Sequence, residues 1–265
     1  MSNPFLGEGR GGASAGIVWA EEGRATQPRE DGAPIENFQD AFQRIEAAVD
    51  GGETDLGKLG FWRLLFKVKA EPRLAHHWAD VAGRIDRRAF ERAVRPRFPV
   101  WFGNAVLLGG TAVGAGAIVA ALRSTDATVS GIALVASAGI LSVSTHDLAH
   151  WAVGRAVGIR FTSYFFGGPF PPRPGIKTDY ATYLRASPGE RAAMHASGAI
   201  ASKLAPFISL AFWPASNAPA WTAWAILAIG VAQIVTDVLF STKSSDWKKV
   251  RRERRAGRAQ RVHAS

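Results

Sequence analysis

The sequence predicts an all-α polytopic membrane protein with four transmembrane helices and a short β-like or re-entrant cytoplasmic segment between the second and third. Charged and apolar residues are segregated, because residues 1–97 and 242–265 carry most of the charge while residues 98–241 are almost continuously apolar. Such segregation is typical of a membrane domain with polar ends. The average composition hides it, since a hydrophobic content of 47% and a mean hydropathy of +0.01 resemble those of a soluble protein.

The first 97 residues are predicted to lie outside the bilayer. Residues 1–33 are rich in Gly, Ala and Glu without periodicity, which predicts disorder, and they lack the basic start and apolar core of a cleaved signal peptide. Apolar side chains then recur at helical spacing up to a Gly pair, which predicts one amphipathic helix. Aromatic and cationic residues mix over 61–94, as in helices at a membrane interface. Residues 34–97 are therefore predicted to form cytoplasmic or interfacial amphipathic helices.

Four apolar stretches are each long enough for a bilayer core, which needs about 20 helical residues. They cover residues 101–122, 127–156, 193–214 and 219–241. Basic residues lie before the first stretch, between the second and third, and after the fourth, whereas the two remaining connections carry one Arg and one Asp, or no charge. The positive-inside rule then predicts cytoplasmic N- and C-termini and a cytoplasmic middle loop, in a multi-pass plasma (inner) membrane.

The chain has no cysteine, so disulfides and thiolate ligands are excluded and His, Asp and Glu remain as metal ligands. Its formal net charge is +10, and residues 243–261 hold nine Lys and Arg against two acids. A basic tail beside a membrane helix is typical of the cytoplasmic side and of anionic lipid. Residues 242–265 are therefore predicted to be a basic cytoplasmic tail that contacts anionic lipid and no nucleic acid. The oligomeric state is left open.

Two histidines and an aspartate interrupt the second apolar stretch in the motif "STHDLAHW". On a helix His146 and His150 share a face about 5 to 6 Å apart, so they can close on one metal ion. Asp147 adds an ionisable group that costs at least about 2.5 kcal/mol near the centre of a membrane helix, and a cost of that size usually marks function. The alternative is that the histidines only form hydrogen bonds with neighbouring helices.

A catalytic zinc site normally has three protein ligands and one open position, so another helix has to supply the third ligand. Asp237 in the fourth stretch lies at a depth comparable to that of the histidines and is a candidate third ligand. A pair with Lys203, or a cap near the helix end, is the alternative for this residue. Asp246 is a rival ligand, although its polar neighbours predict a cytoplasmic position. His195 is predicted to form an ordinary hydrogen bond near the site.

The order of these residues resembles that of the site-2 protease family of intramembrane zinc metalloproteases. Members carry a His-Glu-x-x-His motif in a membrane helix, a Gly soon after it, an aromatic and Gly-rich segment entering a cytoplasmic loop, and a distal ligand Asp. "HDLAHWAVGRAVGIRFTSYFFGGPFPP" follows this order with Asp in place of Glu, and the resemblance covers about 130 to 250. It implies Zn²⁺ held by His146, His150 and Asp237, with Asp147 as the general base.

The resemblance also implies an activity, the hydrolysis of peptide bonds in membrane-helix protein substrates near the cytoplasmic face. "FTSYFFGGPFPP" would present a strand edge to an extended substrate, or form an interfacial re-entrant loop. "SGAIASKLAPF" is loosely similar to a Gly-Pro-x-x-Asn segment of the family, with Ser202 at the Asn position. The residues expected to contact the substrate are Phe165, Phe166, Gly167, Gly168 and Ser202.

Other functions fit parts of the same pattern. A catalytically inactive relative that binds metal, or only a client helix, would carry the same motifs. Di-iron membrane oxidases such as fatty acid desaturases also use a His-Asp-x-x-His box, but they need roughly eight histidines, and this chain has six. A soluble His-Asp phosphohydrolase would not flank the motif with apolar runs of bilayer length.

Overall fold

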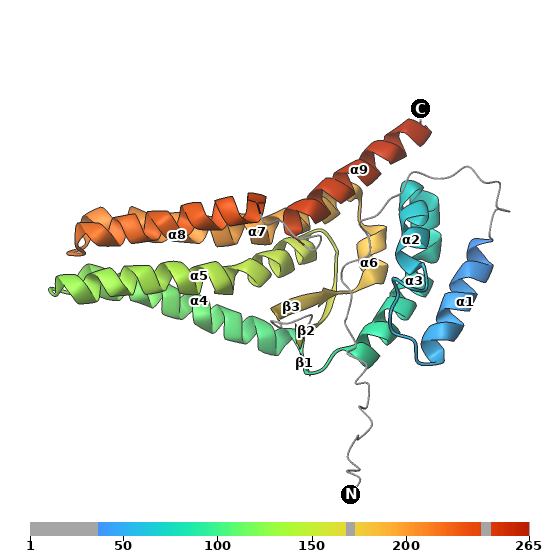
Figure 1. Cartoon of the computed structure of the whole chain (residues 1–265), viewed down its shortest axis with the longest axis horizontal. Helices are drawn as coiled ribbons and strands as arrows, with labels where there is room; N and C mark the ends of the chain where they lie inside the picture. The colour runs from blue at the N-terminus through green and yellow to red at the C-terminus, as the bar shows by residue number, and fades with distance from the viewer. Residues whose placement is uncertain (1–36, 168–172, 240–244, 265) are drawn as a thin grey trace, which may run out of the picture.

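The computed structural model describes residues 37–167, 173–239 and 245–264. It is mostly helical, with one small sheet (Figure 1). The segment 1–33, predicted to be disordered, lies outside the described residues, and so does Gly168. In chain order the elements are α1 (Phe38–Asp50), α2 (Phe61–Ala70), α3 (Pro72–Ala93), β1 (Arg97–Phe98), α4 (Val100–Arg123), α5 (Ala127–Ala156), β2 (Phe161–Gly167), β3 (Arg173–Thr178), α6 (Tyr180–Arg185), α7 (Pro188–Ala211), the 3-10 turn η1 (Trp213–Ala215), α8 (Ala220–Leu239) and α9 (Asp246–Ala264).

Four helices, α4, α5, α7 and α8, are long and apolar enough to cross a membrane, which confirms the four predicted stretches. In Figure 1 they run alongside one another and form the long arm of the molecule. Much of the outer surface of the arm is apolar, and it includes the exposed side chains of Val113 and Trp224. The candidate spans are residues 100–123, 127–156, 188–215 and 220–237.

Helix α5 lies at the centre of the arm, where it packs against α4 and α7 and also meets α8. Buried apolar side chains, among them Leu134 and Ile226, fill the space between these helices. Buried hydroxyl groups are costly unless they are paired. Ser137 and Ser209, from α5 and α7, meet this need because their Oγ atoms lie 3.2 Å apart. The central helix is therefore held on several sides before it reaches the histidine motif.

The two weakly charged connections lie together at one end of the arm. Asn217 Nδ2 donates a hydrogen bond of 2.8 Å to the carbonyl oxygen of Ser124, which joins the α7–α8 connection to the α4–α5 connection. The sheet, α6 and the three N-terminal helices lie at the opposite end (Figure 1). Basic and weakly charged connections are thus separated along the arm, as a membrane topology based on charge requires.

Helices α1, α2 and α3 form a small bundle with its own apolar core, which we call the N-terminal bundle. The predicted amphipathic helix is α1, which begins after Asn37, whose side chain caps it, and ends at Gly51. Phe61 of α2 is buried in this core, because α2 places its apolar side chains on one face. Phe66 is the exception, with 64% of its surface exposed. The interfacial position of these helices stays a prediction.

The N-terminal bundle is fixed to the rest of the chain through α3. Charged side chains along α3 meet partners on β3, at the start of α6 and within α6. The pair between Lys177 and Asp86 is mostly buried, and the Lys177 ammonium also lies 4.9 Å from the centroid of the Phe90 ring. The shortest N–O distances are 2.6 Å for Lys177–Asp86, 2.6 Å for Arg185–Asp80 and 3.3 Å for Arg87–Asp179.

The segment between α5 and α7 forms β2 and β3, which agrees with the predicted β-like segment, and β1 from before α4 completes a three-stranded antiparallel sheet of order β1-β2-β3. Strand β2 is anchored on α4 by Tyr164, whose hydroxyl donates a hydrogen bond of 2.8 Å to Asn104 Oδ1. Gly103 makes room for this ring, because a Cβ atom there would lie 2.0 Å from it. The sheet is therefore held directly beside the spanning helices.

The basic C-terminal tail is a helix, α9, which packs against α7 and α2. Most of its arginine side chains are exposed or half-buried, whereas Val250 and Glu253 are buried. The sequence had indicated a polar tail because basic residues dominate its composition. The face of α9 that packs against the protein is formed by a few residues, which the average composition of the tail does not reveal.

Candidate metal site

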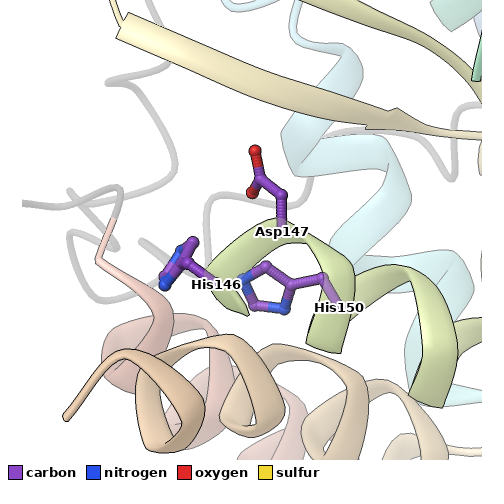
Figure 2. Close-up of side chains that lie close together, drawn as sticks. All are labelled: His146, Asp147 and His150. Atoms are coloured by element: carbon purple, nitrogen blue, oxygen red, sulfur yellow. The ribbon is translucent and has the colours of Figure 1, made fainter. Parts of the chain in front are cut away.

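Helix α5 continues unbroken through the histidine motif and ends at Ala156, so His146, Asp147 and His150 all lie in its last three turns. The ring centroids of His146 and His150 are 4.8 Å apart, which confirms that the two rings share one face. One ligand atom from each of the three residues lies within 4.8 Å of the other two (Figure 2). The sequence motif therefore gives a compact group of possible metal ligands.

Helix α7 orients the ring of His150. The Nδ1 atom of His150 lies 2.7 Å from the carbonyl oxygen of Met194, so we assign its proton to Nδ1, which donates to this carbonyl. Gly198 makes room for the ring, because a Cβ atom there would lie 2.3 Å from Nε2 of His150. The bond and the close approach leave Nε2 with a free electron pair, the arrangement that metal-binding histidines usually show.

His146 is oriented by the same helix. Ser202 Oγ donates its single proton to the carbonyl oxygen of Gly198 at 3.0 Å, so the hydroxyl oxygen can accept from Nδ1 of His146 at 3.3 Å. In this tautomer the Nε2 atom of a neutral His146 ring carries the electron pair. Ser202 had been predicted to contact the substrate, but in this structure it supports a histidine.

The third group at the site is Asp246, the first residue of α9. Its Oδ2 atom lies 3.3 Å from Nε2 of His146 and 3.2 Å from Nε2 of His150. Zinc bonds of about 2.0–2.1 Å in tetrahedral geometry place two ligand atoms about 3.3 Å apart. Both distances therefore match the spacing of ligands around one zinc ion.

Asp246 provides an ionised carboxylate. Lys249 Nζ lies 3.1 Å from Oδ1, the oxygen that does not face the histidines. One carboxylate oxygen is thus neutralised by an ammonium group, and the other is directed to the two rings.

The structure does not bring Asp237, the third ligand that the resemblance implied, to the histidines. Its carboxylate lies 2.7 Å from Nζ of Lys203 on α7, which is the alternative that the sequence left open. Asp237 was predicted to be a ligand because it lies at a membrane depth similar to that of the histidines. Depth alone does not determine which neighbouring helix a side chain faces. Lys203 neutralises it on the adjacent helix, whereas Asp246 reaches the histidines from α9.

Asp147 lies beside this group rather than between the rings. In Figure 2 its carboxylate points from α5 towards the strands, while the two histidine rings lie on the side of α5 that faces the neighbouring helices. A carboxylate in this position can receive a proton from a group held by the histidines without occupying a ligand position itself.

The other residues predicted to contact the substrate lie on β2 in the described part of the chain. Phe165 packs edge-on against Phe90, with ring centroids 5.1 Å apart, and Phe166 is 47% exposed. Gly167 ends β2. His195 forms the ordinary hydrogen bond that was expected, with its Nε2 3.0 Å from the Tyr183 hydroxyl oxygen.

Comparison of the sequence with protein-family models, with curated proteins and with solved structures finds no match. The fold and the site define a helical chain with four helices able to span a membrane and a candidate metal site on the second of them. The likeness to site-2 proteases stays a prediction from the motif.

The first test separates the two candidate third ligands. We expect Asp246→Asn to lower zinc affinity by more than about 100-fold, beyond the 10–100-fold typical of outer-shell changes, because it removes a charged ligand. Asp237→Asn is the matched control and should change affinity by no more than a few-fold. Competition titration with a chromophoric chelator on detergent-purified protein measures both, with His146→Ala as the reference for a lost ligand. The reverse ranking would restore Asp237 as the third ligand.

The second test concerns the close approach of α5 and α7. Gly198→Ala should lower zinc affinity about 10–100-fold, because the methyl group occupies the place of the His150 ring and turns its Nε2 away. Gly139→Ala is the matched control, since a Cβ atom there meets nothing within 4 Å. The same titration is combined with a thermal melt. Equal affinities in the two variants would show that His150 does not depend on this contact.

Proposed function

We propose that this chain is an intramembrane zinc metalloprotease, a hydrolase that cleaves peptide bonds of membrane-helix proteins near the cytoplasmic face. The observation that carries the proposal is the convergence of two histidine Nε2 atoms on one oxygen of Asp246, at 3.2 and 3.3 Å. Asp147 stands beside them on a helix long and apolar enough to cross a membrane. Hydrolytic zinc sites combine these parts, namely three ligands, an open position and a carboxylate.

The donor set favours zinc. Two imidazoles and one carboxylate suit zinc and other borderline metals, and the absence of cysteine argues against the soft, thiolate-bound alternatives. A di-iron centre of the desaturase type needs more histidines than this part of the fold supplies. His76 and His77 are exposed on α3, and the Nε2 of His195 faces Tyr183.

In the proposed reaction some residues would bind the metal ion or orient its ligands, and Asp147 transfers protons. A zinc ion bound to His146, His150 and Asp246 would supply a Lewis acid that polarises the scissile carbonyl group and lowers the pKa of a bound water. Asp147 accepts the proton of the attacking water and returns it to the leaving amine. Ser202 and the Met194 carbonyl hold the two rings in the required tautomer.

The sheet supports a site for an extended substrate. Strand β1 is short and pairs with Tyr164 and Phe165 of β2, the Phe166 N–H donates to the carbonyl oxygen of Pro96, and β3 lies on the other side. A locally unwound membrane helix could add to an edge of this sheet through main-chain hydrogen bonds. The Asp147 carboxylate points towards the strands, so it would lie between such a segment and the histidines (Figure 2).

The proposal places the site on the cytoplasmic side of a plasma (inner) membrane, with both termini cytoplasmic. The basic residues that flank the arm at the end of the site support this orientation. The tail supports contact with anionic lipid, because α9 exposes arginine side chains beside the arm. These are Arg251, Arg254, Arg255, Arg258 and Arg261.

The alternative is an inactive relative that binds metal without cleaving. The shorter side chain of Asp147 is an argument for this alternative. Asp is one methylene shorter than the Glu of the site-2 protease motif, and a misplacement near 1 Å can cost about 10²-fold in rate. We favour activity because Asp keeps the charge and proton affinity of a general base at the same place on the helix.

The third prediction tests this assignment. Asp147→Asn should retain zinc and lose activity, by at least about 10²-fold, because an amide cannot accept the proton of the water. Asp147→Glu is the charge-retaining control and should keep measurable turnover. Cleavage of membrane-helix substrates in reconstituted vesicles is compared at equal zinc loading. Full turnover by the Asn variant would remove Asp147 from the mechanism. No turnover by any of the three proteins, with zinc bound, would favour the inactive relative.

The fourth prediction tests the orientation. The chain lacks cysteine, so a single cysteine at Asn217 can be labelled selectively. We expect a membrane-impermeant thiol reagent to reach it only from outside the cell, because Asn217 lies in the uncharged connection far from the basic flanks. A cysteine at Arg185, in α6 beside the N-terminal bundle, is the control and should react only from the cytoplasmic side. Labelling of the Asn217 variant only from the cytoplasm would refute the topology.

A further inference from the structure

Helix α9 carries two acidic side chains that both point into the protein. They are Asp246 at the metal site and Glu253, and they are the two acids among the basic residues of 243–261. Seven residues are close to two helical turns, or about 10.5 Å, so the two carboxylates lie on nearly the same face of α9. Both carboxylates therefore attach the same face of α9 to the rest of the protein.

Glu253 is completely buried and has three partners. Its Oε2 atom accepts a hydrogen bond of 2.5 Å from Nε of Arg191, while Oε1 accepts one of 2.9 Å from the hydroxyl of Tyr183 and lies 3.1 Å from Nζ of Lys69. Burial raises the pKa of Glu253, but the charges of Lys69 and Arg191 outweigh burial and hold this pKa well below its ordinary value. The carboxylate is thus an ionised centre that joins α9 to α2, α6 and α7.

Lys69 is the partner that comes from the N-terminal bundle. Its side chain is buried, and its ammonium lies 5.0 Å from the centroid of the Tyr183 ring and 5.5 Å from that of Tyr180. A second hydrogen bond joins α2 to α9, because Gln260 Nε2 donates to the carbonyl oxygen of Lys69 at 2.8 Å. Helix α2 therefore holds α9 at two points beyond Asp246.

We propose that Lys69 is a positioning residue for the metal site. Through its ion pair with Glu253 the N-terminal bundle fixes α9 along its axis and so sets Asp246 against His146 and His150. A partner or stimulus that shifts α2 would then loosen the metal site without touching a ligand. This inference rests on the proposed metal site, and it assigns the bundle the part of a regulatory element for that site.

Lys69 can be replaced by an uncharged residue without leaving the buried Glu253 carboxylate unpaired. After Lys69→Met the Glu253 carboxylate keeps Arg191 and Tyr183 as partners, so no isolated ion is buried. Lys177→Met is the control, because Lys177 also makes a mostly buried ion pair with the bundle and a contact with an aromatic ring, but its partner is Asp86 on α3. It is the harsher change of the two, since it removes the ion-pair partner of a buried carboxylate. Both variants weaken the attachment of the bundle, and only the first reaches α9.

We expect Lys69→Met to lower zinc affinity about 10–100-fold, as changes in groups that orient metal ligands do. Lys177→Met should leave it within a few-fold of the unchanged protein. The measurement is the chelator competition titration with zinc alone on the full chain in detergent, with a thermal melt of each variant to compare folding.

A disulfide can replace the function of Lys69 and distinguish positioning from general damage. A Cβ atom at Gly257 of α9 would lie 3.1 Å from Cβ of Pro188 on α7, close to the spacing of about 3.5–4.5 Å between bonded cysteines. Pro188→Cys with Gly257→Cys can therefore join α9 to α7 independently of α2. Because the chain has no other cysteine, no competing pair can form.

In the Lys69→Met background, oxidation of this pair should restore zinc affinity, and reduction should abolish the gain. The cysteine pair with Lys69 unchanged is measured in both redox states to subtract zinc bound by free thiols. Affinity that stays low after oxidation, or a loss in Lys177→Met as large as in Lys69→Met, overturns the inference. Unchanged affinity in Lys69→Met overturns it as well. An unaltered protein that binds no zinc would instead refute the proposed function.

Discussion

The site depends on one electrostatic constraint, the meeting of a carboxylate oxygen with two unprotonated imidazole nitrogens. The carbonyl oxygen of Met194 and the hydroxyl of Ser202 take the Nδ1 protons, so both Nε2 electron pairs point to Asp246. Asp246 Oδ2 lies 3.3 Å from one Nε2 atom and 3.2 Å from the other, and electron-rich atoms at these distances repel one another unless a cation lies among them. A proton or a metal ion meets this need, and a metal ion satisfies all three atoms at once.

Three helices have to be held in register for this meeting, and each is fixed by different chemistry. Apolar packing and paired hydroxyls hold α5, a glycine lets α7 approach closely, and buried charge holds α9. The buried charge that holds α9 tolerates change least, because removing one partner of a buried ion is strongly destabilising. The N-terminal bundle supplies one of those partners, so a region outside the spanning helices takes part in the geometry of the site.

Much of this arrangement can be predicted from sequence. Length and apolarity give the four spanning helices, and the i, i+4 spacing places His146 and His150 on one face. The third ligand cannot be obtained in the same way, because a partner from α9 depends on how that helix folds back. A signal was present, since Asp246 and Glu253 are the only acids among the basic residues of 243–261 and lie two turns apart. The sequence left Asp246 open as a rival ligand, but its polar neighbours predicted a cytoplasmic position and so favoured Asp237.

The pair between Lys203 and Asp237 has a consequence for how the chain enters a membrane. Lys203 alone would make α7 costly to insert, because a charge near the centre of a membrane helix costs about 2.5–3.5 kcal/mol on translocon-based scales. Together, 2.7 Å apart on α7 and α8, Lys203 and Asp237 present no net charge to the lipid. The two helices are joined by a short turn around η1, so they are suited to enter as one hairpin rather than in sequence. The charge that appeared to belong to the metal site thus joins the last two candidate spans as one ion-paired hairpin.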